Sequence, residues 1–258
     1  MRMIPAAKRE VALPGLMRQP EAGADPTDEL PEEVTWLGGG QRFVTCAFYT
    51  ENYLGRVLRL KDSLNRFGLN HHLKLVPRRL TWEATTRLKA SFVAECLERF
   101  PDHDVLYLDA DAIIRKPPIF LNTINSDVGL LFTPVMRDGK RFLSIAAGTL
   151  YVRNTQGGRH FTNIWRMNEP KVAPLGLDED MIYSAFNELE GVSFTALPRS
   201  YSKIFDSPGP DPVIEHFQAS RKQLKLSKLM RRSRRALYIA LLVSVVVIAV
   251  SSIMRLFN

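Results

Sequence analysis

Cysteine is scarce in this sequence, which limits the kinds of site that the chain can build. There are only two cysteines, Cys46 and Cys96, and each lies inside an apolar segment. Their spacing fits neither a zinc-binding motif nor a disulfide framework, so both are expected to be buried thiols. The first residues also lack the continuous apolar stretch of a secretory signal peptide, so the sequence gives no indication of export.

Acidic residues are absent from the end of the chain, and this absence explains its charge. The formal net charge is +8, yet no aspartate or glutamate follows Glu215. Eight lysines and arginines lie within positions 221–235, whereas residues 1–220 are close to neutral. A neutral body does not fit a general nucleic-acid-binding protein. Nucleic acid is therefore not an expected partner.

Four segments of different composition follow one another. Residues 1–35 are rich in proline and acidic residues without a sustained period, so they are expected to form a disordered leader. Residues 36–222 have the length of one globular domain. Residues 223–235 are expected to be a basic linker beside a membrane, and residues 236–254 to be a transmembrane helix.

The membrane span is expected because residues 236–254 are nineteen positions without a charge. As a helix they would measure about 28 Å, close to the hydrocarbon thickness of a bilayer. A buried core helix is the alternative, but such helices rarely follow a run of cations at a chain end. Because positive charge favours the cytoplasmic side, the sequence predicts a single-pass C-terminal anchor, a cytoplasmic body and a linker lying on anionic lipid.

Hydrophobic periodicity predicts an α/β fold in the body of the chain. Strands are expected at 42–49, 72–77 and 105–108, with an amphipathic helix between each pair, the second capped by Thr81. This order is typical of a largely parallel, three-layer sheet with helices on both faces. Further strands are expected at 128–132, 148–152, 192–196 and 213–217, and further helices at 158–167 and 178–186.

Two aspartates directly after the third strand give the clearest functional signal. Asp109 and Asp111 follow the apolar run Val105 to Leu108. Residues i and i+2 of an extended segment point the same way, so both carboxylates are expected at the carboxyl end of a strand, where open α/β sheets bind ligands. Mg²⁺ and Mn²⁺ prefer such oxygen ligands and often share them with substrate phosphates. Two solvated aspartates in a turn are the alternative, which the apolar segments on both sides disfavour.

Four motifs, in this order, resemble those of GT-A glycosyltransferases. They begin at Val105 (VLYLDADA), Ala147 (AGTLYV), Leu177 (LDEDMI) and His216 (HFQASRK). The resemblance is to the nucleotide-diphospho-sugar transferases related to glycogenin and the lipopolysaccharide galactosyltransferases, and it spans about residues 42–222. It implies a Rossmann-like GT-A mixed sheet and a retaining hexosyltransferase whose expected donor is a UDP-sugar.

The resemblance also implies a metal and diphosphate site. Asp109 and Asp111 would bind Mn²⁺ or Mg²⁺ together with His216, and Asp109 would also face the donor. Lys222 matches a lysine that binds the diphosphate, although Ala219 stands where a glycine is usual.

Further residues match positions around the transferred sugar and the nucleotide. Asp178 and Glu179 match an acid–amide pair that faces the sugar, with glutamate in place of the common glutamine, and they are the expected catalytic residues. Gly148 would line the donor sugar from a loop. Further expected donor contacts are Thr50, Tyr53 and Lys89.

Most of these residues also have an ordinary structural explanation. Tyr53 belongs to the apolar stripe of its helix, and Gly148 could simply start a strand. Lys222 could be the first of the membrane-facing cations, and His216 taken alone could be an ordinary surface or core residue. Acids in the first turn of a helix, such as Asp178, stabilise the helix without any catalytic role.

A cytoplasmic body on a bilayer suits a lipid-linked or glycan acceptor. A DNA- or protein-modifying glycosyltransferase and a non-catalytic nucleotide-sugar-binding membrane scaffold are the alternatives. A sugar nucleotidylyltransferase is disfavoured, because it should have a glycine-rich, arginine-bearing loop after its first strand, and Cys46 to Glu51 contains neither residue.

Protease protection of a membrane-inserted chain with a reporter at each terminus tests the expected topology. Protease added on the cytoplasmic side should digest the N-terminal body, because the positive flank of residues 236–254 favours that side. An N-terminal body protected from this protease would show that the predicted topology is wrong.

Overall fold

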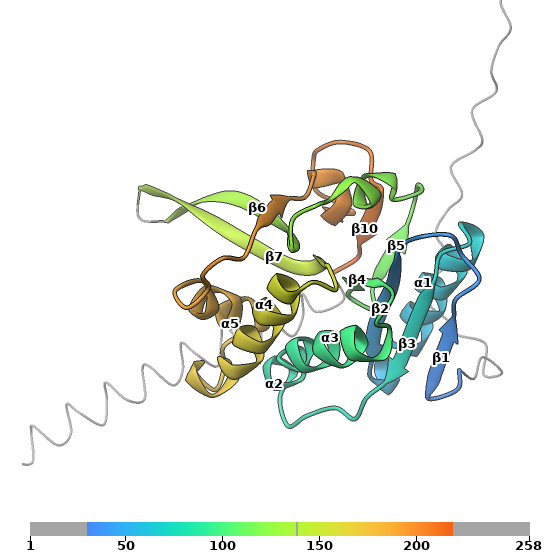
Figure 1. Ribbon diagram of the computed structural model, residues 1–258, viewed down its shortest axis with the longest axis horizontal. Helices are drawn as coiled ribbons and strands as arrows, with labels where there is room; N and C mark the ends of the chain where they lie inside the picture. The colour runs from blue at the N-terminus through green and yellow to red at the C-terminus, as the bar shows by residue number, and fades with distance from the viewer. Residues whose placement is uncertain (1–29, 138, 219–258) are drawn as a thin grey trace, which may run out of the picture.

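A seven-stranded mixed sheet runs through the middle of the protein (Figure 1). The computed structural model describes residues 30–137 and 139–218. Neighbouring strands follow the order β1-β3-β2-β4-β7-β6-β8, and β3, β2 and β4 are mutually parallel whereas β7 runs antiparallel to β4. The predicted mixed α/β class is therefore confirmed. The strands are β1 (Glu33–Trp36), β2 (Phe43–Tyr49), β3 (His71–Leu75), β4 (Asp104–Leu108), β6 (Val128–Arg137), β7 (Lys140–Val152) and β8 (Phe194–Ala196).

Helices cover both faces of this sheet because side chains alternate along its strands. On one face Cys46 and Tyr107 pack in a core shared with three helices, and on the other Ala47 and Leu106 pack against a fourth. Both cysteines are buried and free, as expected. The first three helices are α3 (Leu88–Arg99), α4 (Gln156–Met167) and α5 (Asp178–Phe186), and the fourth is α1 (Leu54–Arg66).

A second, three-stranded sheet lies beside the first and connects distant parts of the chain. It contains β5 (Ala112–Ile114), β10 (Ile214–His216) and β9 (Lys203–Ile204), in that order. β5 begins just after the aspartate pair, and β10 runs antiparallel to it with His216 opposite Ala112. This pairing carries the late part of the chain to the end of β4. Short 3₁₀ helices complete the described structure: η1 (Glu51–Tyr53), η2 (Ile119–Thr123), η3 (Glu169–Lys171) and η4 (Arg199–Ser202).

The leader predicted for residues 1–35 includes part of a strand. Residues Glu33–Trp36 form β1, which pairs antiparallel with β3, and the Trp36 ring stacks on His71 with ring centroids 5.9 Å apart. The prediction of disorder is wrong for residues 33–35, because apolar Val34 and Trp36 alternate with polar neighbours in the pattern of a strand.

The single helix expected after Thr81 is two helices, α2 (Trp82–Thr86) and α3. Thr81 caps α2 as predicted, because its hydroxyl accepts from the Ala84 N–H at 3.1 Å. The hydroxyls of Thr85 and Thr86 donate to backbone carbonyls within the same turn. Threonine side chains that compete for these carbonyls weaken a helix, and α2 ends here.

The strands expected at 128–132 and 148–152 are the bases of a much longer hairpin. β6 and β7 continue to Arg137 and Lys140, which face each other across a two-residue connection, and the hairpin projects from the body of the protein (Figure 1). Gly139 has φ +73°, a conformation that favours glycine. An Asp-Gly pair between apolar strand-forming segments is a sequence signal for such a hairpin, and the predicted strands stopped short of it.

Within residues 30–137 and 139–218, no helix is long and apolar enough to cross a bilayer. The expected basic linker at 223–235 and the expected span at 236–254 lie outside these residues.

Candidate functional site

A cavity of about 600 Å³ opens where β2 and β4 end. Tyr49 and Thr50 line it from the end of β2, and Asp109 from the end of β4. Both strands therefore deliver their following residues to one edge of the sheet, as the sequence predicts for a ligand site in an open α/β sheet.

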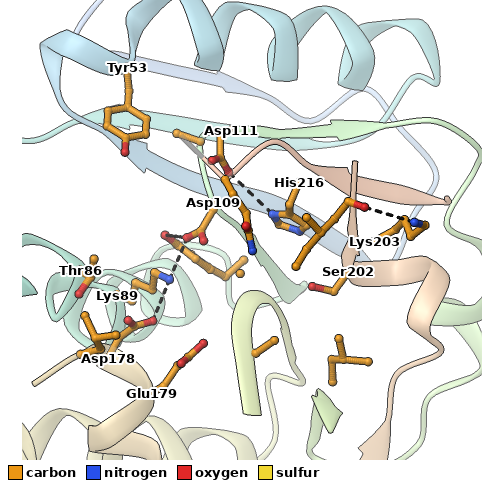
Figure 2. A pocket seen from close by; sticks show the side chains of 18 of the residues that line it. Tyr53, Thr86, Lys89, Asp109, Asp111, Asp178, Glu179, Ser202, Lys203 and His216 are labelled. Carbon is orange, nitrogen blue, oxygen red and sulfur yellow. Dashed lines mark hydrogen bonds and ion pairs between the residues drawn. The ribbon is translucent and has the colours of Figure 1, made fainter. Parts of the chain in front are cut away.

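Asp109, Asp111 and His216 converge at this cavity (Figure 2). Each offers one ligand atom, and these atoms all lie within 4.8 Å of one another. The two aspartates lie in a tight turn, closed by a 2.9 Å bond from the Ala112 N–H to the Asp109 carbonyl, rather than on an extended strand. The turn leads into β5, whose pairing with β10 supplies the histidine.

A threonine hydroxyl orients the His216 ring. Its Nε2 lies 2.8 Å from the Thr149 hydroxyl oxygen, and its Nδ1 lies 3.8 Å from an Asp111 carboxylate oxygen. If Nε2–H donates to Thr149, the lone pair of Nδ1 faces the aspartates, which is the tautomer that a metal ligand needs. Only 5% of His216 and 9% of Asp111 are exposed, so both side chains are held in place by packing.

Gly148 leaves room beside these ligands. It lies inside β7 rather than in the expected loop, where the pairing of β6 and β7 shifts register between Leu130 and Leu131. A Cβ on Gly148 would stand 3.0 Å from an Asp109 carboxylate oxygen and 3.2 Å from the His216 ring. The bulge thus brings bare backbone against the cluster, a common use of bulges next to functional sites.

The donor set fits a divalent cation. Carboxylate oxygens suit Mg²⁺ and Mn²⁺, and imidazole is a common ligand of divalent transition metals. Three protein ligands on the wall of an open cavity leave coordination positions for a substrate. Asp109, Asp111 and His216 would hold the ion.

A buried lysine joins the aspartate pair to helix α5. The Lys89 ammonium lies 2.8 Å from a carboxylate oxygen of Asp109 and 2.8 Å from one of Asp178. Burial by itself lowers the pKa of Lys89, but the two carboxylates outweigh it and raise that pKa well above its usual value. The lysine is therefore a permanent cation that fixes both acids.

Asp178 and Glu179 begin α5 and line the cavity. Burial raises the pKa of Asp178, and the Lys89 cation opposes this rise. Burial and the neighbouring charge of Asp178 raise the pKa of Glu179 to about 7. Glu179 also accepts a 3.4 Å hydrogen bond from the Ala147 N–H. The two adjacent acids thus differ, because Asp178 is ion-paired with Lys89, whereas Glu179 gains or loses its proton near neutral pH.

The expected nucleotide contacts lie at the same cavity. Thr50 is buried and its hydroxyl donates to the Asn52 side chain at 2.7 Å. Tyr53 also lines the cavity, where burial and the nearby carboxylates of Asp111 and Asp109 raise the pKa of Tyr53 to about 12. Lys222 lies outside the described residues.

Sequence reasoning missed several residues of the site. The Tyr107 hydroxyl donates to Asp109 at 3.2 Å, and Thr149 orients His216; both read as ordinary strand residues in the sequence. Tyr107 precedes Asp109 by two positions, and this spacing was an available signal that the two share a side of the chain. Three further cations also line the cavity: Arg78, Arg199 and Lys203.

No family model matches the sequence, and no curated protein matches it. A solved glycosyltransferase involved in the glycosylation of the major capsid of PBCV-1 matches with a TM-score of 0.53 and 14% identity, covering 74% of this chain and 99% of that one. GlyE of Streptococcus pneumoniae TIGR4 matches with a TM-score of 0.46 and 17% identity, over 69% of this chain and 55% of GlyE. The galactosyltransferase LgtC, solved with donor and acceptor sugar analogs, matches with a TM-score of 0.42 and 12% identity, over 69% and 87%. The first match shows that this chain has the fold of a glycosyltransferase, which the sequence motifs implied.

Replacing Lys89 should destabilise the protein strongly. Lys89→Met leaves two carboxylates without their shared cation, so the free energy of unfolding at neutral pH should fall by about 3–5 kcal/mol. Urea denaturation followed by tryptophan fluorescence, to which buried Trp165 contributes, measures this change. Lys74→Met, which breaks an exposed pair with Glu95, is the control and should cost below about 1 kcal/mol. Similar small losses in both variants would contradict the role given to Lys89.

Glu179 should make the protein less stable as pH rises. Its folded pKa is raised from 4.5 to about 7, so the folded state binds this proton more tightly than the unfolded chain. The stabilisation that this bound proton gives is complete below the pKa of Glu179 in the unfolded chain. It is lost as the pH rises through the pKa of Glu179 in the folded protein. On going from about pH 5 to pH 8, the free energy of unfolding of Glu179→Gln should therefore rise by roughly 2–3 kcal/mol relative to that of the native protein. Chemical denaturation at both pH values tests this, with exposed Glu190→Gln as control; identical pH profiles for Glu179→Gln and the native protein would refute it.

Proposed function

We propose that this protein is a metal-dependent glycosyltransferase that moves a hexose from a nucleotide-diphospho-sugar, a UDP-sugar, to a lipid-linked or glycan acceptor. The observation that carries the proposal is the convergence of Asp109, Asp111 and His216 at the wall of a large cavity. The shared fold with a glycosyltransferase supports it. Residues far apart in the sequence meet there with a ligand set suited to a divalent cation.

The charges around the cavity suit a donor with a diphosphate. Four acids line it, two of which pair with Lys89, while Arg78, Arg199 and Lys203 line it as further cations. A divalent ion held by the Asp–Asp–His cluster would neutralise charge on the departing diphosphate. Lys203 also lines the cavity, so it is a second candidate for contact with these phosphates, in addition to Lys222.

The second acid cluster suits the sugar end of the donor. Cleavage of the sugar–oxygen bond makes the anomeric carbon cationic, and a carboxylate fixed nearby stabilises that charge. Lys89 fixes Asp178 at the cavity wall, and Glu179 beside it can hold a proton near neutral pH. Asp178 and Glu179 are therefore the proposed catalytic residues, with retention of configuration.

The proposed acceptor follows from the end of the chain. Residues 236–254 have the composition of a membrane span, and eight cations precede them. We infer a C-terminal anchor that holds the catalytic domain on the cytoplasmic face of a membrane, where lipid-linked acceptors are within reach.

Release of UDP from a panel of UDP-sugars, with Mn²⁺ or with a chelator, tests this function. Transfer and slow hydrolysis should both require the metal. Asp111→Asn should lower the rate by about 100-fold or more, because it removes a charged ligand from the site that stabilises the leaving group. Far-ultraviolet circular dichroism should remain native.

Asp102→Asn is the matched control, because Asp102 is exposed just before β4, at the opposite end of that strand. It should retain full activity. Undiminished activity in Asp111→Asn would exclude the proposed metal site. Donor binding without turnover by the native protein would point to a non-catalytic scaffold instead.

A further inference from the structure

The tip of the β6–β7 hairpin exposes large apolar and basic side chains together. Met136, Phe142 and Leu143 are 64%, 49% and 62% exposed, and Lys140 and Arg141 beside them are exposed as well. These five residues form the hairpin tip. Apolar side chains gathered at a projecting tip commonly mark a surface that another body covers.

Strand register places both kinds of side chain on each face of the tip. Met136 lies opposite Arg141 across the hairpin, and Leu143 follows Arg141 by two positions, so these three side chains share one face. Lys140 and Phe142 alternate with them and point to the other face. A flat protein surface would cover one of these faces, whereas the interfacial zone of a bilayer surrounds an inserted tip on both.

The charge of the tip favours an anionic surface. Two of its five residues, Lys140 and Arg141, are basic, and none is acidic. Lysine and arginine next to bulky apolar residues are the combination by which peripheral segments bind anionic lipid, with cations at the phosphates and apolar groups below them.

We propose that the hairpin tip inserts into the interfacial region of an anionic lipid bilayer. This contact uses neither the metal-site residues nor residues 236–254. It gives the folded body a membrane contact of its own, separate from the proposed anchor.

The hairpin also connects this contact to the cavity. Its base lines the cavity through Leu131, Thr133 and Ala146. Tyr183 of α5 holds the strand in between, because its hydroxyl donates to the Leu143 carbonyl at 3.0 Å and accepts from the Ile145 N–H at 2.7 Å. Thr133 and Met136 are three steps apart along the strand, roughly 10 Å. If the proposed function holds, an inserted tip sets the cavity close to the headgroups and favours a lipid-borne acceptor.

Site-directed fluorescence tests the proposal in the full-length protein. Because Cys46 and Cys96 are buried, an added surface cysteine can be labelled selectively. Phe142→Cys carries a bimane probe at the tip, and Leu37→Cys carries it at a residue of matched exposure, 47%, next to β1 at the far edge of the sheet. Each protein is mixed with phosphatidylcholine vesicles, with and without phosphatidylglycerol, whose acyl chains bear bromine as a quencher.

The probe at the tip should be quenched several-fold more than the probe at Leu37→Cys, and only when phosphatidylglycerol is present. Met136→Cys gives a second reading in case Phe142→Cys folds poorly. Adding Lys140→Glu and Arg141→Glu to the labelled protein should remove the dependence on anionic lipid.

Two results would overturn the proposal. One is quenching that is absent at the tip or equal at both positions. The other is a tip signal that changes with protein concentration without lipid, which would identify a second copy of the chain as the partner. UDP release in detergent is measured in parallel on the charge-reversed variant. It should be unchanged, so a failed membrane contact is distinguished from a failed catalytic assignment.

Discussion

The antiparallel pairing of β5 with β10 is the constraint on which the site depends. It sets His216 opposite Ala112, one position beyond Asp111, and so joins two segments that are far apart in the sequence. Phe217, the residue after β10, holds the same segment in place. Its ring stacks on Phe205 with centroids 5.4 Å apart and lies 5.0 Å from the Arg59 guanidinium. Backbone pairing and ring packing together fix the imidazole before any ligand binds.

Charge is divided between two neighbouring centres. Lys89 pairs with Asp109 on one side and Asp178 on the other, which offsets part of the repulsion among the four carboxylates that line one cavity. Asp109 belongs to both centres, because it pairs with the lysine and also faces His216 across the space beside Gly148. The Asp109–Asp111–His216 cluster and the acids at the start of α5 are therefore linked through one side chain.

The sequence predicted the position of site residues that directly follow a strand or begin a helix. Asp109 and Asp111 follow a buried strand, and Asp178 begins a helix, so their placement could be predicted from periodicity. Contacts between distant strands could not. The hydrogen bond of Thr149 to His216 depends on the bulge in β7, and the end of α2 depends on threonine hydroxyls that bond to nearby carbonyls. Such features result from tertiary pairing and side-chain competition, which apolar periodicity does not record.

The short strand β1 protects an edge of the main sheet. Its four residues occupy the outer backbone groups of β3, which would otherwise be available to another chain. A shortened protein beginning after Trp36 would uncover β3 while leaving the cavity at the ends of β2 and β4 untouched. Loss of solubility through strand-to-strand association, rather than loss of the cavity, is the consequence of removing a segment that looks dispensable in the sequence.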